Sequence, residues 1–277
     1  MIEISQVGYN IMRAIKFYNE EICMKSVKFL IFCIIYLFAC KSFGFQCTHK
    51  SCNDDRLFLS PHFVNLHSST ISISGVGGGL GGDALWYDRE FYAHTNVGIN
   101  FMDFNTHSSH NILSTNRGFG TFSVFGDIGF NLGSLSKPLF LGFAIPMEMY
   151  NLNSSNSPNG LSIGIIGFGL NLSQRYIELL PDVRFEYALG IYYGLGVYNF
   201  AALEPKGLFR NGLNTQGFIT QGFVGLTYGE RYNLFGRLKA KYHQLQDSKT
   251  LIVDNGLSAF YPASQNFTLV LELGMGF

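Results

Sequence analysis

Phe267-Thr-Leu-Val-Leu-Glu-Leu-Gly-Met-Gly-Phe277 is the stretch of sequence that decides the fold. Its odd positions are all apolar, and its even positions are small or polar apart from Val270. Because successive side chains of a strand point to opposite faces, this alternation predicts a strand with one continuous apolar face. The strand runs to an aromatic last residue, whereas the ends of soluble chains are usually frayed and polar. An edge strand of a soluble β-sandwich is the alternative interpretation.

The composition favours a protein surface that faces lipid. Of the 277 residues, 14% are charged and 16% are aromatic, whereas an average soluble domain is about 25% charged. The formal net charge is zero, so no overall field favours nucleic acid or acidic partners. Beyond residue 44 the sequence has no run of about 18 apolar residues, which excludes spanning helices. Lipid satisfies no backbone polar groups, so a membrane protein without such helices must form a closed barrel.

Residues 24–44 have the organisation of a signal peptide. Two lysines precede an apolar run that is too short for an anchor, and Ser42-x-Gly44 supplies small residues for cleavage. Two alternatives are a lipoprotein, in which Cys40 carries the lipid, and a retained helix. Residues 1–23 contain three glutamates that fit no export leader. We therefore expect translation to begin at Met24, with the upstream stretch as a gene-model artefact.

Two cysteines, Cys47 and Cys52, remain after the predicted cleavage. An even pair of cysteines in an exported protein predicts a disulfide. The loop that this bond closes is short, so the disulfide would stiffen a local turn more than staple the fold. His49 between the two cysteines is a single ligand, and the sequence predicts no metal site.

Alternation like that of the last strand recurs along the chain. Its longest example is the stretch 183–197, where the odd positions are apolar throughout, although a soluble strand averages only about five or six residues. Residues 161–173 are apolar at both parities, so the pattern does not say which face points outward. We predict the remaining strands at 56–64, 70–82, 97–101, 122–132, 139–149, 218–228, 232–242 and 267–277.

Short and long connections alternate between these strands. The short turns are 133–137 and 229–231, the stretch 174–182 is intermediate, and the long loops are 105–117, 151–160, 199–215 and 243–264. Such alternation, with both termini at the short-turn end, is typical of outer-membrane barrels. Asp83–His94 is predicted to be a further loop, and its Trp86 would belong to an aromatic girdle at the membrane surface. Other aromatic residues near strand ends extend this prediction of a girdle: Phe119, Tyr150, Tyr176, Tyr198, Tyr228, Tyr232, Tyr242, Phe267 and Phe277.

The predicted fold is all-β, a transmembrane antiparallel up-and-down β-barrel. Eight strands run from about residue 95 onward and the glycine-rich stretch 70–82 is a ninth, so an even number needs one more. The candidate is Arg56–Val64, although Pro61 lacks the N–H that a ladder requires. Ten strands are favoured, with eight as the alternative. Residues 45–68 would form a periplasmic segment with the disulfide and the first strand, and residues 69–277 would form the barrel.

The charged residues of the strands fall on the polar parity. A lysine or arginine that faces lipid near the midplane costs about 2–4 kcal/mol, so we expect these charges inside the barrel. A lumen of eight to ten strands is nearly filled by side chains, and balanced charges there favour ion pairs over an ion-selective ring of one sign. The predicted lumen charge network consists of Asp127, Glu148, Arg184, Glu186, Arg237, Lys239, Lys241 and Glu272.

Catalytic and cofactor sites have little support in the sequence. His107 and His110 share a loop with Ser108 and Ser109, but serine-rich loops contain such neighbours by chance, and a general base must reach its nucleophile. The glycines of 77–82 precede no helix, so they do not form a phosphate site. We predict no catalytic residue, no cofactor and no metal.

The signal peptide and the closing strand resemble those of small outer-membrane β-barrel proteins of Gram-negative bacteria. The glycine-rich first strand, the Asn/Ser-rich loops and the terminal Phe277 resemble the Helicobacter and Campylobacter types of these proteins. The resemblance implies a location in the cell outer membrane, with outer-membrane lipid, lipopolysaccharide and the barrel-assembly machinery as partners. It also implies that the closing strand is the assembly signal, through Phe267, Leu269, Leu271, Leu273, Met275 and Phe277.

Three functions remain open at the level of sequence. The first is a non-enzymatic barrel with a side-chain-filled lumen, whose outer loops bind or adhere to a host or surface ligand. The second is a narrow porin-like channel for small solutes. The third is an enzyme at the outer rim that modifies lipid or cleaves protein. No nucleic acid is expected as a partner of any of them.

Overall fold

A computed structural model describes residues 46–108, 120–151, 161–200, 213–229, 234–252 and 258–276. The predicted signal peptide, the stretch upstream of it, Phe277 and the centres of the long predicted loops lie outside the described residues. No helix in the described part of the chain is long and apolar enough to cross a membrane.

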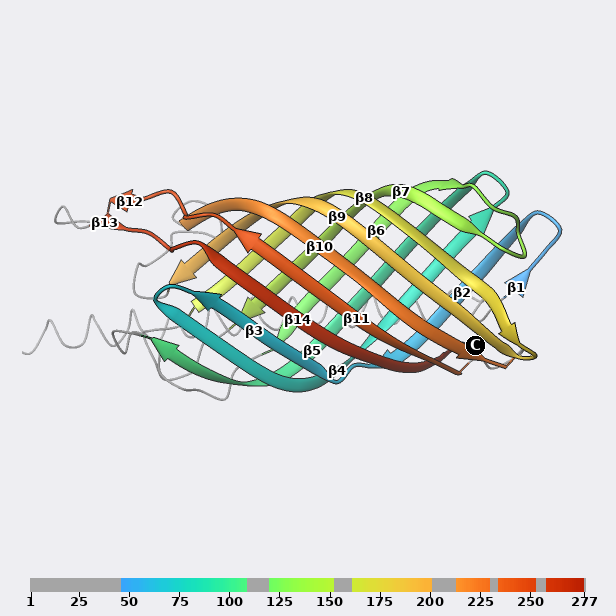
Figure 1. The fold of residues 1–277 in the computed structure, drawn as a ribbon, viewed down its shortest axis with the longest axis horizontal. Coiled ribbons are helices and arrows are strands. Elements are labelled where there is room, and N and C mark those ends of the chain that lie inside the picture. Colours follow the sequence, from blue (N-terminus) through green and yellow to red (C-terminus); the bar gives the residue numbers. More distant parts are fainter. Residues whose placement is uncertain are drawn as a thin grey trace, which may run out of the picture. The chain divides into compact units, whose positions relative to one another are not determined.

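Antiparallel strands make up almost all of the described chain (Figure 1). They are β1 (Gln46–Cys47), β2 (Ser51–Leu59), β3 (His62–Ser68), β4 (Ile71–Asp88), β5 (Phe91–Ser108), β6 (Thr121–Asn131), β7 (Leu139–Asn151), β8 (Leu161–Leu180), β9 (Val183–Phe200), β10 (Leu213–Tyr228), β11 (Leu234–Leu245), β12 (Leu251–Ile252), β13 (Ser258–Ala259) and β14 (Ser264–Gly276). The short strands β12 and β13 pair only with each other, and every other strand belongs to one sheet.

The sheet closes on itself because β2 and β3 together act as one strand. Both pair with β4 on one edge and with β14 on the other, in the same register on either side of the break. At the break, Ser60 and Gly79 exchange backbone hydrogen bonds of 2.9 and 3.1 Å. The Leu271 N–H still donates to the Pro61 oxygen at 3.0 Å, so proline removes only the return bond toward β14. The barrel therefore has ten strands, as the sequence favoured.

Residues 51–68 lie in the barrel wall, which corrects the predicted division at residue 69. The predicted strand 56–64 is the centre of this longer strand. It was hard to recognise because Pro61 interrupts it and because its inward positions include Asp54 and Arg56.

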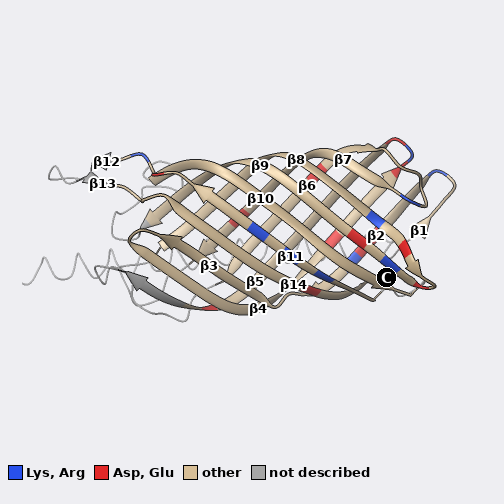
Figure 2. Ribbon diagram, in the orientation of Figure 1, with Lys and Arg blue, Asp and Glu red and all other residues tan. Residues whose placement is uncertain are grey.

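Side chains alternate between the outside and the inside of the barrel, with apolar residues outside. On β9, Leu189 and Ile191 are 58% and 50% exposed, whereas Glu186 and Tyr192 between the outward positions are 1% exposed. Figure 2 shows long parts of the wall without a charged residue, and charges gathered mainly in the half nearer the C-terminus. An apolar exterior around a polar interior is the arrangement that a barrel needs in lipid.

The two ends of the barrel differ in their connections. We call the end with residues 89–90, 132–138 and 181–182 the turn end, where β2 begins and β14 ends (Figure 1). The opposite end, the loop end, carries the strand ends that flank the undescribed residues 109–119, 152–160, 201–212 and 253–257.

Two predicted connections are wrong in their extent. Most of Asp83–His94 belongs to β4 and β5, which are joined by residues 89–90 alone. Likewise β8 runs on to Leu180, so the stretch 174–182 is mostly strand. In both cases polar residues that point into the lumen look like loop residues in the sequence.

The predicted aromatic girdle is correct in part. Trp86 (42% exposed) and Tyr228 (59%) face outward near the turn end, and Phe267 (40%) faces outward near the loop end. Tyr150 and Tyr198 instead point inward and are buried, because they lie on the inward parity of β7 and β9. Tyr176 is also buried, for a different reason described below.

Candidate functional site in the barrel lumen

Seven of the eight charged residues predicted for the lumen point into it, and the structure adds five more. The predicted Arg184 is half-buried at the turn end, with its guanidinium carbon 6.0 Å from the ring centre of Tyr176. The sequence prediction missed Asp54, Arg56, Asp83, His94 and Arg175. We define the lumen network as Asp54, Arg56, Asp83, His94, Asp127, Glu148, Arg175, Glu186, Arg237, Lys239, Lys241 and Glu272.

Arginine–carboxylate pairs cross the lumen. Arg56 on β2 places Nη1 2.9 Å from Oε1 of Glu186 on β9. Arg237 on β11 places its Nε 2.5 Å from the same oxygen. Because β2 and β9 are four strands apart in a ring of ten, the Arg56–Glu186 pair joins nearly opposite walls. All three side chains are at most 2% exposed.

Further pairs link the same arginines to the other walls. Arg175 on β8 donates to Oδ2 of Asp54 at 3.0 Å and to both oxygens of Asp83 at 3.2 Å. Arg237 also donates to Asp83 and lies 3.5 Å from Oε2 of Glu272. Lys239 donates to Glu272. Buried ions are tolerated when each has a well-placed partner, and these contacts supply one for every carboxylate named.

His94 lies between two carboxylates. Its Nε2 is 2.5 Å from Oδ1 of Asp83 and its Nδ1 is 3.0 Å from Oδ1 of Asp127. Arg175 places its Nη2 3.1 Å from the same Nε2, so the ring also contacts a cation. The six carboxylates of the lumen network face five Lys or Arg side chains and His94.

A smaller group lies toward the loop end. Glu148 on β7 accepts hydrogen bonds from Lys241 on β11 and from the Tyr150 hydroxyl. His243 places its Nε2 3.7 Å from Oε2 of Glu148. This group again joins walls four strands apart, because β7 and β11 are separated by β8, β9 and β10.

A β-bulge in β8 turns two consecutive side chains into the lumen. The register with β9 shifts between Gln174 and Ile177, and Tyr176 has a φ of 61°. A non-glycine residue in this left-handed region is strained by about 1–3 kcal/mol. Arg175 and Tyr176 are both buried, and the Tyr176 hydroxyl donates to Asp54. Bulges commonly re-aim a side chain in this way. The strained backbone at Tyr176 therefore directs its hydroxyl, one more hydrogen-bond donor, toward the lumen network.

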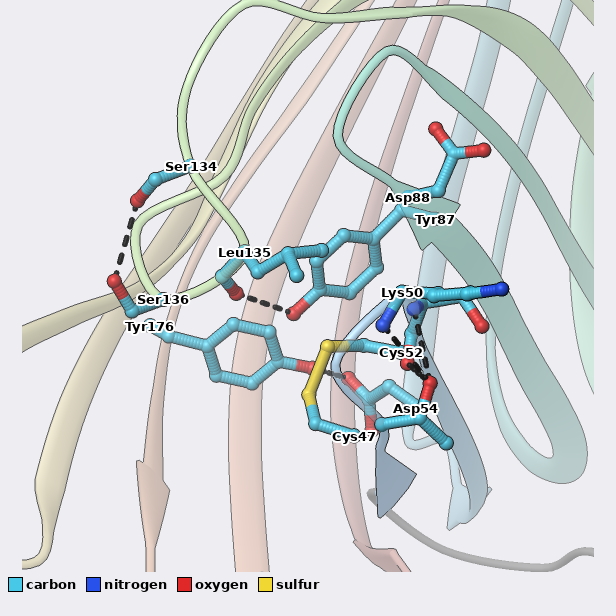
Figure 3. Close-up of a disulfide and its surroundings, with 12 residues drawn as sticks. Cys47, Lys50, Cys52, Asp54, Tyr87, Asp88, Ser134, Leu135, Ser136 and Tyr176 are labelled. Atoms are coloured by element: carbon cyan, nitrogen blue, oxygen red, sulfur yellow. Dashed lines mark hydrogen bonds between the residues drawn. A yellow bond between two sulfur atoms is a disulfide. The ribbon is translucent and has the colours of Figure 1, made fainter.

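The turn end of the lumen is covered by a disulfide-bonded hairpin. β1 pairs with β2, and Cys47 and Cys52 are bonded across this pair. Figure 3 shows the ring of Tyr176 beside the disulfide, with its hydroxyl directed at Asp54. Cys52 is fully buried in an apolar cluster that includes Tyr87, Phe140 and Tyr176. The disulfide therefore packs beside Tyr176, which donates to the lumen network, as well as stiffening a turn.

The connection 132–138 completes this cover. The Tyr87 hydroxyl donates to the backbone oxygen of Leu135 at 3.1 Å (Figure 3), and Leu135 packs against the same apolar cluster. Side chains from β2, β4, β7 and β8 thus meet under one inward-folded connection.

The loop half of the lumen is filled by apolar residues. β8 contributes Leu161, Ile163 and Ile165, all at most 4% exposed, which explains why residues 161–173 are apolar at both parities. The cluster further contains Val64, Leu66, Ile71, Ile73, Met102, Phe104, Tyr198, Leu213, Ile219 and Leu245. Among the charged residues of the lumen network, including Glu148, Arg175 and Arg237, is a cavity of about 30 Å³, room for about two water molecules.

No metal-binding group of three or more His, Cys, Asp or Glu side chains occurs within the described ranges. The catalytic candidates of the sequence cannot be placed, because His110 and the side chain of His107 lie outside what the structure describes. The buried carboxylates of the lumen network and His94 are engaged in ion pairs and hydrogen bonds with one another.

The predicted assembly signal lies on the outer face of β14. Phe267, Leu271, Leu273 and Met275 are 39–48% exposed, Leu269 is half-buried, and Phe277 lies outside the described residues. Val270 and Glu272 point inward.

These features define the class of protein. A closed antiparallel barrel that is apolar outside and ionic inside is a transmembrane β-barrel.

No protein-family model and no curated protein matches the sequence. Among solved structures, the translocator domain of the autotransporter NalP from Neisseria meningitidis is similar at 12% identity and a TM-score of 0.37, covering 84% of this chain and 90% of that one. An outer membrane channel from Pseudomonas putida F1 is similar at 9% identity and a TM-score of 0.38, covering 86% and 98%. The P. putida toluene transporter TodX is similar at 9% identity and a TM-score of 0.29, covering 83% and 91%.

Proposed function

We propose that the protein is an integral outer-membrane barrel that conducts no solute, performs no catalysis and serves as a rigid support for surface loops. The observation that carries the proposal is the set of ion pairs from nearly opposite walls, of which Arg56–Glu186 is the clearest. Salt bridges of this kind fill the cross-section through which a solute would have to pass.

Opening such a lumen is costly. Removing the partner of a buried ion costs about 3–5 kcal/mol, and a pore of useful width would separate Arg56, Arg175 and Arg237 from their carboxylates at the same time. The cavity of about 30 Å³ beside them is too small for a solute larger than water. Apolar residues above this layer and the disulfide hairpin below it add two further barriers.

The orientation in the membrane follows from the connections. Outer-membrane barrels keep short turns in the periplasm and longer loops outside, so the turn end would be periplasmic and the loop end external. The loops predicted at 105–117, 151–160, 199–215 and 243–264 would then be available to a host or surface ligand. The outer face of β14 would engage the barrel-assembly machinery before it meets lipid and lipopolysaccharide. A closer relation to Helicobacter and Campylobacter proteins is part of the same proposal.

Conductance in planar bilayers tests the closed lumen. We expect no discrete openings from the wild-type protein, and openings from a variant that combines Arg56→Ser, Glu186→Ser and Arg237→Ser, which removes the crossing side chains. Discrete openings of the wild-type protein would replace our proposal by the narrow-channel alternative. Membrane residence is tested separately, by the shift of the unboiled protein on a gel and its recovery from the outer-membrane fraction.

A further inference from the structure

The outer surface of the barrel carries a groove of about 440 Å³ over β2, β4, β5, β6 and β7. Short side chains form its floor, including Ala84 and Thr95, and Gly126 leaves open space where a Cβ would meet nothing within 4 Å. Larger residues line its turn-end side, including Ile128 (65% exposed) and Phe143 (48%).

Asp55 lines one end of this groove. Its neighbours in sequence, Asp54 and Arg56, point inward, so the Asp55 side chain belongs to the outer face of β2. Within the described residues its carboxylate has no hydrogen bond and no ion pair. A charged group on the lipid-facing side of a barrel is unfavourable, and a cation beside it would offset that penalty.

We propose that the groove binds a phospholipid with a primary ammonium head group. The Asp55 carboxylate accepts a hydrogen bond from the ammonium, and an acyl chain of the lipid lies along the floor of the groove. The inference rests on the proposed membrane residence. Asn53, two residues nearer the turn end on the same face, also lines the groove and offers an amide donor to the phosphate. The groove opens on the turn half of the barrel, next to Trp86, a residue type that favours the membrane–water interface.

The chemistry selects one class of lipid. A primary ammonium combines a positive charge with N–H donors, so it satisfies Asp55 by a charge-assisted hydrogen bond. A choline head group has the charge without the donors, and a glycerol head group has no positive charge. Phosphatidylethanolamine should therefore be preferred over phosphatidylcholine and phosphatidylglycerol.

Trp86 makes the groove observable, because it lines the groove and is the only tryptophan of the chain. The full-length mature protein is folded into phosphatidylcholine vesicles that contain a small fraction of a lipid with brominated acyl chains, which quench tryptophan fluorescence at contact. We expect brominated phosphatidylethanolamine to bind about fivefold more tightly than brominated phosphatidylcholine, as an ion pair of about 1 kcal/mol would give.

Two variants separate the head-group contact from the acyl-chain contact. Asp55→Asn removes the charge, and Gly126→Leu fills the floor of the groove while Asp55 remains. In each variant phosphatidylethanolamine and phosphatidylcholine should bind about equally. Asp103→Asn is the matched control, because Asp103 is an exposed carboxylate on the outer face of β5 nearer the loop end, and it should keep the fivefold preference. The heat-induced gel shift verifies that each variant is folded.

The outcomes distinguish the groove from the membrane assignment. Equal quenching of wild-type Trp86 by all three lipids, or a preference that survives Asp55→Asn, would overturn the lipid site and leave the barrel assignment intact. Loss of lipid quenching as the protein-to-lipid ratio rises would show that a second copy covers the groove, which also overturns the site. Absence of quenching by every brominated lipid would instead contradict the membrane residence itself.

Discussion

Replacing Arg237 by methionine tests whether the lumen network holds the barrel together. The Arg237 guanidinium reaches Glu186 through Nε at 2.5 Å and through Nη2 at 3.3 Å, donates to Asp83 and lies 3.5 Å from Glu272. Methionine keeps most of the side-chain volume and removes all of these donors. No single substitution elsewhere in the lumen network would uncouple three carboxylates at once.

The expected loss of stability can be worked out from the partners that remain. After Arg237→Met, Glu186 keeps Arg56, Asp83 keeps Arg175, and Glu272 keeps Lys239. No carboxylate is left wholly unpaired, so we place the loss at the lower end of the range for broken buried pairs, about 3 kcal/mol. Arg184→Met is the control, because Arg184 is half-buried at the turn end. It should cost about 1 kcal/mol or less.

A double-mutant cycle with Glu186→Gln isolates the direct contact. In the double variant no unpaired charge remains at this contact, so the combined loss should be smaller than the sum of the single losses. Residues that share a network couple by about 0.5–3 kcal/mol, and the two hydrogen bonds of Arg237 with Glu186 place this pair in the upper half of that range.

Urea unfolding of the protein in vesicles measures these differences, with Trp86 fluorescence and the heat-induced gel shift as two independent readings. Coincident transitions would justify two-state free energies. A loss below about 1 kcal/mol for Arg237→Met, equal to that of Arg184→Met, would refute the reasoning. Strict additivity in the cycle would show that the pair contributes no direct coupling, whatever the size of the single losses.

Three other changes should have distinct effects in the same assay. Tyr176→Phe removes a hydroxyl donor from a buried carboxylate and should lower the unfolding free energy by about 1.5–3 kcal/mol; no measurable change would contradict the role given to the bulge. Leu238→Arg puts a charge on the lipid face near the middle of β11 and should cost about 2–4 kcal/mol, against about 0–1 for Gln244→Arg near the loop end; equal costs would count against lipid contact. Replacing Cys47 and Cys52 by serine should cost about 2 kcal/mol, the entropy of a short closed loop, and a loss of refolding altogether would show that the hairpin does more.

The strand pattern of this barrel could be predicted wherever inward positions are small or singly charged. On β7, β9 and β14 every second residue is a large apolar group, which lipid requires, and this alternation predicts the outward faces correctly. The number of strands also followed from the sequence, because an even count required a partner for the glycine-rich strand. Outward apolar residues indicate a strand face strongly in the sequence, because every one of them faces lipid.

The inward positions are harder to recognise because a lumen tolerates any residue that finds a partner. Asp83, His94 and Arg175 were assigned to loops, since polar residues in a row usually indicate turns. In the structure the turn between β4 and β5 is held by Asp88, whose Oδ1 accepts from the N–H groups of Glu90 and Phe91 at 2.7 Å each. Asp54 and Asp83, the partners of Arg175, lie 121 and 92 residues away from it in the sequence, and no local pattern contains such pairs.

Three tyrosines predicted for the girdle are buried in the structure, and the alternation of the sequence predicts the inward direction of two of them. Tyr150 shares the parity of Glu148, and Tyr198 shares that of Glu186, so both could have been assigned to the lumen from the alternation alone. Tyr176 could not, because the bulge after Gln174 changes the parity within β8. A bulge depends on the fit between two strands, and the sequence of one strand does not specify it.

The lumen network also bears on how the barrel closes. The seam between β14 and the first strand has a weak point at Pro61, where one ladder hydrogen bond is missing. On either side of it the first strand is held from inside: Arg56 pairs with Glu186 across the lumen, and the Ser60 hydroxyl donates to Oδ1 of Asn100 at 2.6 Å. Since β2 reaches β9 only through the interior, Arg56–Glu186 can form only when the sheet has curled enough to bring those walls together. Charge pairing and ring closure should therefore be one cooperative step, in which the ionic contacts compensate for the proline in the seam.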